Sequence, residues 1–143
     1  MRRAVATMWY ALFLGVLICI FMALRLLFFP ARFKYKEVSF ENFVFLGLTY
    51  VVIMIGFGIL YLLLDMKGFH VFNDVEADMA AGRSFFSNLG TSIYLSAVTL
   101  FSVGFGDVAP VGIGRMLAII EALLGYTIPA AFVVRTFIDF DPS

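Results

Sequence analysis

Three long runs with almost no charged residues dominate the pattern of hydrophobic and polar positions along the chain. They cover residues 4–24, residues 43–64 and, interrupted only by Glu121, residues 116–134. About 20 consecutive apolar residues form a helix long enough to cross the roughly 30 Å hydrocarbon core of a bilayer. The pattern therefore predicts three transmembrane helices.

A shorter apolar stretch lies between the second and third runs. Residues 89–101 are too few to cross a membrane, but they suffice for a re-entrant helix with Asn88 as a candidate N-cap. A polar segment, residues 65–83, precedes this stretch, and a glycine-containing loop, residues 102–106, follows it. We therefore expect an all-α membrane protein with three transmembrane helices and one re-entrant helix.

Composition supports a membrane protein and gives no sign of an enzyme. The 143 residues are 63% hydrophobic and 14% charged, whereas soluble domains are about 45–50% apolar and about 25% charged. Ten basic and ten acidic residues balance, which gives no reason to expect a nucleic-acid partner. The sequence has no metal-ligand cluster, nucleophile–base pair or phosphate-binding loop, so we expect neither catalysis nor a small-molecule substrate.

The N-terminal run is interpreted as a membrane span. Arg2 and Arg3 followed by an apolar stretch are also typical of a signal peptide. The stretch is longer than the usual apolar core of about 7–15 residues, and no clear cleavage site follows it. It also lacks the polar face that a helix lying on the membrane surface needs.

The loop at residues 102–106 has the features of a cation-binding backbone. A dehydrated cation needs several oxygens to replace its water, and stacked backbone carbonyls can supply them. To aim consecutive carbonyls at one axis, the chain must alternate between ordinary and left-handed dihedrals, which glycine tolerates best. Gly104 and Gly106 have the required spacing, with Val103 and Phe105 pointing away from the axis. Ser102 adds a hydroxyl at the inner end.

This loop, followed by Asp107, resembles the selectivity filter of the potassium channel superfamily, usually Thr-Val-Gly-Tyr-Gly-Asp. Two neighbouring stretches strengthen the resemblance, in the right order and at the right spacing. Residues 94–100 are similar to the family's pore helix, and residues 114–125 to its inner-helix opening, Gly-Arg-x-x-Ala…Glu-x-x-x-Gly. The resemblance covers about residues 43–137 and is to a small bacterial-type two-transmembrane pore-loop channel, here with an additional N-terminal helix.

The resemblance implies a potassium-selective pore in a lipid bilayer. Because each chain gives one filter strand, it implies a homotetramer, with K+ as the transported ion and no organic cofactor. The metal site is the filter, made of Ser102, Val103, Gly104, Phe105 and Gly106. The implied pore domain (43–138) has outer helix 43–64, pore helix 89–101, filter 102–106 and inner helix 113–137. Outside the resemblance, we expect an additional transmembrane helix (1–29) and a cytoplasmic connector (30–42).

The resemblance also assigns supporting and gating roles. Tyr94, Thr99, Asp107 and Glu121 are expected to support the filter. Asp107 is expected to accept a hydrogen bond from Tyr94, and Glu121 to brace the pore helix rather than to bind ions, although an intramembrane carboxylate is costly.

The gating candidates are Gly125 and Pro129. Pro129 removes a backbone donor, which predicts a bend near residues 125–129. Gly125 is either a hinge or a close-packing position, and the sequence leaves both interpretations open.

Three departures from the usual pattern reduce the polar bracing of the filter. Ser102 replaces the usual threonine of the filter, Phe105 replaces its tyrosine, and Phe101 replaces the threonine just before the filter. A hydroxyl restored at position 105 would have Tyr94 and Ser96 as its nearest expected partners.

Potassium selectivity nevertheless remains the expectation, because ether-à-go-go-related potassium channels share Ser-Val-Gly-Phe-Gly. A non-selective cation channel and a non-conducting subunit of a larger channel assembly are the alternatives.

Charge does not decide the orientation in the membrane. With the N-terminus outside, five basic residues fall on each side of the membrane, so the positive-inside rule favours neither orientation. In the resembling family the pore loop enters from outside, which implies an outer N-terminus and a cytoplasmic C-terminus. No span carries basic residues at every third position, so a voltage sensor of the usual type is not expected.

Overall fold

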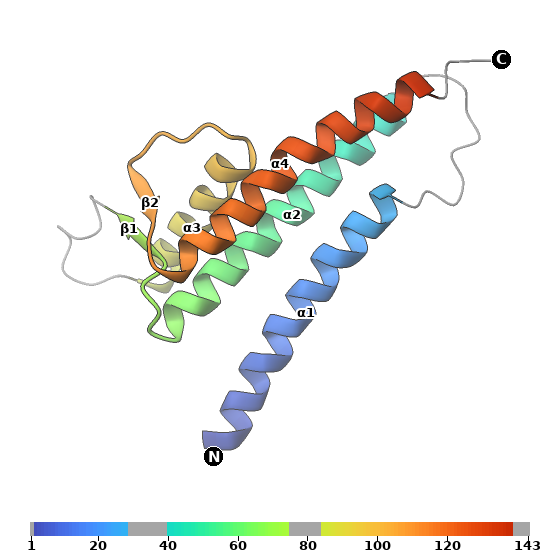
Figure 1. The fold of residues 1–143 in the computed structure, drawn as a ribbon. Coiled ribbons are helices and arrows are strands. Elements are labelled where there is room, and N and C mark those ends of the chain that lie inside the picture. Colours follow the sequence, from blue (N-terminus) through green and yellow to red (C-terminus); the bar gives the residue numbers. More distant parts are fainter. Residues whose placement is uncertain (1, 29–39, 75–83, 139–143) are drawn as a thin grey trace.

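Three long helices and one short helix make up nearly all of the fold (Figure 1). The computed structural model describes residues 2–28, 40–74 and 84–138. The elements in chain order are α1 (Arg2–Phe28), α2 (Phe40–Met66), β1 (Phe72–Asp74), α3 (Phe85–Leu100), β2 (Val108–Pro110) and α4 (Ile113–Ile138).

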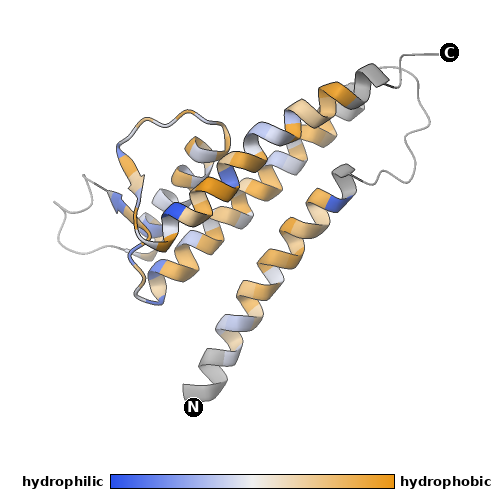
Figure 2. Ribbon diagram, in the orientation of Figure 1, coloured by the Kyte–Doolittle hydropathy of each residue, from blue (hydrophilic) through white to orange (hydrophobic). Residues whose placement is uncertain are grey.

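The three long helices are the predicted membrane spans. Thr7–Arg25, Phe43–Met66 and Ile113–Val134 are each long and apolar enough to cross a bilayer. Hydrophobic positions run along all three helices, and hydrophilic ones are most frequent at the end that carries β1, although strongly hydrophilic positions also occur near the end of α1 and within α4 (Figure 2). Helices that are apolar on every side are typical of membrane spans. The predicted all-α architecture, with three spans and a shorter helix before the third, is confirmed.

The re-entrant helix begins earlier than predicted. α3 starts at Phe85, and its N-cap is Ser84, whose extended backbone lets its hydroxyl accept from the Phe86 N–H (3.2 Å). The prediction of Asn88 as the N-cap was wrong, because Asn88 lies inside the helix and its side-chain amide donates to Asp65 (3.2 Å). At the other end, α3 stops at Leu100.

The other predicted boundaries differ by a few residues. α2 begins at Phe40, within the stretch expected to be the connector, and ends at Met66. Residues 30–39 of the predicted connector lie outside the described residues. α4 runs from Ile113 to Ile138, against the predicted 113–137, and stays helical through Pro129.

The core is centred on α2, which packs against the other helices through close backbone approaches. On one side, a Cβ at Gly58 would lie 3.0 Å from the side chain and 3.1 Å from the Cα of Ile93 in α3. On another side, a Cβ at Gly56 would lie 2.7 Å from the Ile20 side chain of α1. The buried core includes Ile53, Phe57, Leu60 and Tyr61 of α2, Leu95 and Leu100 of α3, and Ile128 of α4.

A small sheet closes the end of the molecule where the loop returns. β1 and β2 pair antiparallel, with Phe72 opposite Pro110. The Val111 N–H donates to the Val71 carbonyl (2.8 Å), and Gly114 packs so closely on Val71 that any side chain there would meet its carbonyl. These contacts fix the chain that follows the loop at residues 102–106.

Candidate functional site

The short helix α3 ends in a turn that also starts the candidate filter. Phe101 is the C-cap, and Ser102 follows it with a left-handed φ of 56°. The Ser102 N–H donates to the Thr99 carbonyl (3.1 Å), and the Val103 N–H donates to the Val98 carbonyl (2.9 Å). This pair of bonds is a Schellman motif, which ends a helix with one left-handed residue. Helix termination therefore explains the conformation of Ser102, and Thr99 contributes through its carbonyl.

Two further left-handed residues follow, and no helix end requires them. Gly104 has φ 58° and Gly106 has φ 83°. Val103 and Phe105 between them do not have positive φ, since Ser102 is the only non-glycine residue with positive φ in the described part of the chain. The expected alternation is therefore present. It is the backbone condition under which carbonyls of consecutive residues face the same side.

The side chains of this loop are largely uncovered within one chain. Val103 is 50% exposed and Phe105 is 72% exposed, although both are apolar. The ring of Phe101 is also more than half exposed. Contiguous exposed apolar surface marks an interaction site, so this loop is a surface on which other groups can pack.

Tyr94 and Asp107 join α3 to the far end of the loop. The Tyr94 hydroxyl donates to the Asp107 carboxylate at 2.7 Å, as predicted. This hydrogen bond holds the pKa of Asp107 below its ordinary value and raises the pKa of Tyr94. Asp107 is exposed and Tyr94 is half-buried in the single chain, and both lie outside the three spans.

Glu121 lies in α4 and connects it to two other helices. Its carboxylate is fully buried and accepts from the Tyr61 hydroxyl of α2 (2.9 Å) and from the Ser96 hydroxyl of α3. Ser96 also contacts the Met54 carbonyl of α2 (2.8 Å). The predicted contact between Glu121 and the short helix is present, and the buried carboxylate has hydrogen-bond donors at both oxygens.

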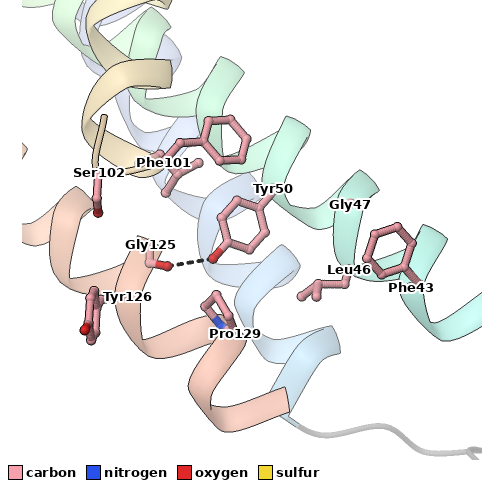
Figure 3. Close-up of a pocket in the computed structure, with 10 residues that line it drawn as sticks. Phe43, Leu46, Gly47, Tyr50, Phe101, Ser102, Gly125, Tyr126 and Pro129 are labelled. Carbon is pink, nitrogen blue, oxygen red and sulfur yellow. Dashed lines mark hydrogen bonds between the residues drawn. The ribbon is translucent and has the colours of Figure 1, made fainter. Parts of the chain in front are cut away.

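The two gating candidates lie beside a pocket below the loop (Figure 3). At Gly125, any side chain would collide with the Leu100 carbonyl at the end of α3, so α4 and α3 touch through backbone there. This contact favours the close-packing interpretation of Gly125. The pocket has a volume of about 560 Å³ and is lined by Phe43, Leu46, Gly47, Tyr50, Leu100, Phe101, Ser102, Gly125, Tyr126 and Pro129.

The partners expected for a hydroxyl at position 105 are already engaged. Ser96 is fully buried between Met54 and Glu121, and Tyr94 is bonded to Asp107. Sequence reasoning predicted the Tyr94–Asp107 bond but missed the two acceptors of the Ser96 hydroxyl, because the fold brings them to Ser96 from 25 and 42 residues away in the sequence.

Tyr50 and Tyr61 were also missed as site residues. The Tyr50 hydroxyl donates to the Gly125 carbonyl at 2.7 Å, across 75 residues. A usable signal was present, because a tyrosine within an apolar membrane span needs an acceptor inside the protein.

Comparison with known proteins places this site in a family. Residues 49–140 match the family model described as "Ion channel", which covers more than half of the chain. Protein LctB of Geobacillus stearothermophilus is 50% identical over 92 residues, 64% of this chain and 67% of that protein. Protein LctB of Bacillus caldotenax is 45% identical over the same coverage. No solved structure matches the chain significantly.

Proposed function

The chain belongs to the ion-channel family, and from this premise we propose that four copies form a potassium-selective pore. The observation that carries the proposal is the backbone of Gly104 and Gly106, whose left-handed φ values alternate with ordinary ones in a loop anchored to a re-entrant helix. Carbonyls of residues 102–106 on this backbone supply the oxygens that replace the water of a potassium ion, which is the transported substrate.

Exposed apolar surface supports an assembly of identical copies. Met116, Ile119, Leu123 and Tyr126 follow one another at helical spacing along α4, and each is at least 65% exposed in the single chain. Val103 and Phe105 add apolar surface at the loop. One chain supplies a single filter strand, so several must surround an axis, and closed symmetry is the usual outcome for identical subunits. A ring of four matches the filters of potassium channels.

The short helix α3 also contributes electrostatically to the proposed pore. Its C-terminal end, at Leu100, lies directly before the filter. The C-terminal end of a helix carries partial negative charge, which favours a cation close to it. The Schellman turn keeps this end in place, because it ties Ser102 and Val103 to carbonyls of the last helical turn.

The proposed orientation has the N-terminus outside and the C-terminus in the cytoplasm. α1 begins at the end of the molecule where α2 finishes and α4 starts (Figure 1). Contact between the Tyr10 ring and Lys67, 4.2 Å from the ring centroid to the ammonium, supports this antiparallel arrangement of α1 and α2. If the pore loop enters from outside, as in the resembling family, the N-terminus is on that side.

Replacing Gly104 by alanine tests the filter assignment. A methyl group at φ 58° costs about 1–2 kcal/mol for the left-handed conformation and is expected to displace the neighbouring carbonyls. We expect loss of potassium flux into liposomes that contain the purified variant.

Gly15→Ala is the matched control, because Gly15 lies in α1 with open space around its Cα and an ordinary φ. It should conduct like the wild type. Normal potassium-selective flux through Gly104→Ala would contradict the assignment of residues 102–106 as the filter. Flux of sodium equal to that of potassium in the wild type would make the protein a non-selective cation channel.

A further inference from the structure

The helix α4 has a missing backbone donor one turn after Gly125. In a regular helix the Gly125 carbonyl accepts from the N–H of residue 129, but Pro129 has no N–H. Inside a membrane, an unpaired backbone carbonyl is costly because no lipid group can donate to it. The Tyr50 hydroxyl of α2 donates to this carbonyl at 2.7 Å, in a buried environment (Figure 3).

The same tyrosine also contacts the base of the candidate filter. Its ring stacks on Phe101, with ring centroids 5.6 Å apart and an angle of 20° between the rings. Phe101 caps α3 and directly precedes Ser102. Tyr50 therefore contacts the inner helix with its hydroxyl and the residue before the filter with its ring.

Tyr50 shares a pocket with the residues that it connects. Tyr50, Phe101, Gly125 and Pro129 all line the pocket of about 560 Å³ between α2 and α4 (Figure 3). A change in the course of α4 at Pro129 would move the Gly125 carbonyl relative to Tyr50, so the hydrogen bond between them would have to break or move with it.

We propose that Tyr50 is a positioning residue for gating: it replaces the missing Pro129 donor, fixes the course of α4 and couples it to the filter base through Phe101. The functional part of this proposal rests on the proposed conduction. The bond itself does not, since it depends only on the fold. If Tyr50 only filled space, the effect of removing its hydroxyl would not depend on whether residue 129 is proline.

A double-mutant cycle distinguishes a tyrosine that replaces the Pro129 donor from one that only fills space. Tyr50→Phe removes the hydroxyl and keeps the ring on Phe101. Pro129→Ala restores an N–H that can donate to the Gly125 carbonyl, which makes the tyrosine hydroxyl redundant.

In single-channel recordings, Tyr50→Phe should change the ratio of open to closed times roughly fivefold or more, as expected for the loss of about one net hydrogen bond. In the Pro129→Ala background, the same replacement should change the ratio by no more than about twofold, the usual scatter of independent changes.

Tyr10→Phe is the matched control. Tyr10 lies exposed on α1 and does not line the pocket, and its hydroxyl has no hydrogen-bond partner among the described residues. Its removal should leave the ratio within about twofold of the wild type. The ratio of potassium to sodium permeability should be unchanged in all these variants, because none alters the filter backbone.

Thermal unfolding of the four proteins in detergent gives a second readout that needs no current. Tyr50→Phe should lower the Tm of the wild type, and should leave the Tm of Pro129→Ala unchanged. If Tyr50→Phe does not fold, recovery of folded protein in the double variant supports the proposal, and failure to recover overturns it.

Equal effects of Tyr50→Phe in both backgrounds, in gating and in Tm, would overturn the role assigned to Tyr50. A wild-type protein that does not select potassium contradicts the proposed function instead, and leaves the Tm cycle as the test of Tyr50.

Discussion

At the Asp107 end of the candidate filter, a single hydrogen bond from Tyr94 to Asp107 joins two segments that lie 13 residues apart. Its strength depends on the charge of the carboxylate, because bonds to an ionised acceptor are roughly twice as strong as neutral ones. The bond lowers the pKa of Asp107. Its stabilising contribution is therefore complete above the ordinary pKa of about 3.9 and is lost as pH falls through the lowered value.

Acid should consequently loosen the Asp107 end of the candidate filter. We expect the wild-type current to be stable at neutral pH and to decay faster once the outer pH falls below about 4. Tyr94→Phe should decay faster already at neutral pH and should show a smaller acid-dependent component, since the ionised Asp107 then keeps only its backbone hydrogen bonds, from the Val108 N–H and from its own N–H. The measurement is the decay of potassium current at several outer pH values.

Tyr10→Phe serves as the control for this prediction, because it keeps the aromatic ring beside Lys67. The same acid-dependent decay in the wild type and in Tyr94→Phe would show that the contact does not hold the loop.

Residue-scale prediction from sequence worked where the chemistry is local. The alternation at Gly104 and Gly106 followed from the spacing of two glycines, whereas the Tyr94–Asp107 bond followed from the resemblance to the potassium channel family. The left-handed Ser102 was not anticipated, because serine seldom adopts this conformation and only the helix end before it supplies the reason. Thr99 was expected to support the filter, and its carbonyl receives the Ser102 N–H.

At the scale of elements, Glu121 determines how α2, α3 and α4 fit together. Its two oxygens accept from Tyr61 and Ser96, both fully buried. In Glu121→Ala these hydroxyls lose their shared acceptor, although Ser96 retains the Met54 carbonyl. An unsatisfied buried group costs about 1–3 kcal/mol, so we expect Tm in detergent to fall by several degrees.

Glu121→Gln is the comparison for this variant. Glutamine keeps the volume and an acceptor for Tyr61, so its Tm should lie between those of the wild type and Glu121→Ala. If the alanine and glutamine variants unfolded at the same temperature, the hydrogen bonds would have no measurable part in joining the helices.

The elements themselves were predictable, and their contacts were not. Apolar runs located all three spans, because the thickness of the membrane sets the number of consecutive apolar residues that a span needs, and this number can be read from the sequence. The start of α3 was misplaced because Ser87 and Asn88 interrupt its apolar pattern. The strands β1 and β2 were missed because three-residue strands leave no pattern. Pairings such as Tyr50 with Gly125 depend on how the helices are placed in three dimensions.

At the scale of the whole molecule, α1 is a peripheral helix. It packs on α2 through Ile20 at Gly56, on a different side of α2 from the contact between Gly58 and α3. Most of its large side chains are exposed, among them Leu14, Phe21 and Met22. In the proposed tetramer this places α1 outside the ring formed by α4, facing lipid.

The central claim is that four such chains form a pore that selects potassium. The most direct test is the reversal potential of the purified wild-type protein in a planar bilayer with potassium on one side and sodium on the other. We expect a large reversal potential, with the sign given by potassium movement down its gradient. We expect no such currents from Gly104→Ala. A reversal potential near zero would contradict potassium selectivity, and a protein that carries no current alone would contradict conduction.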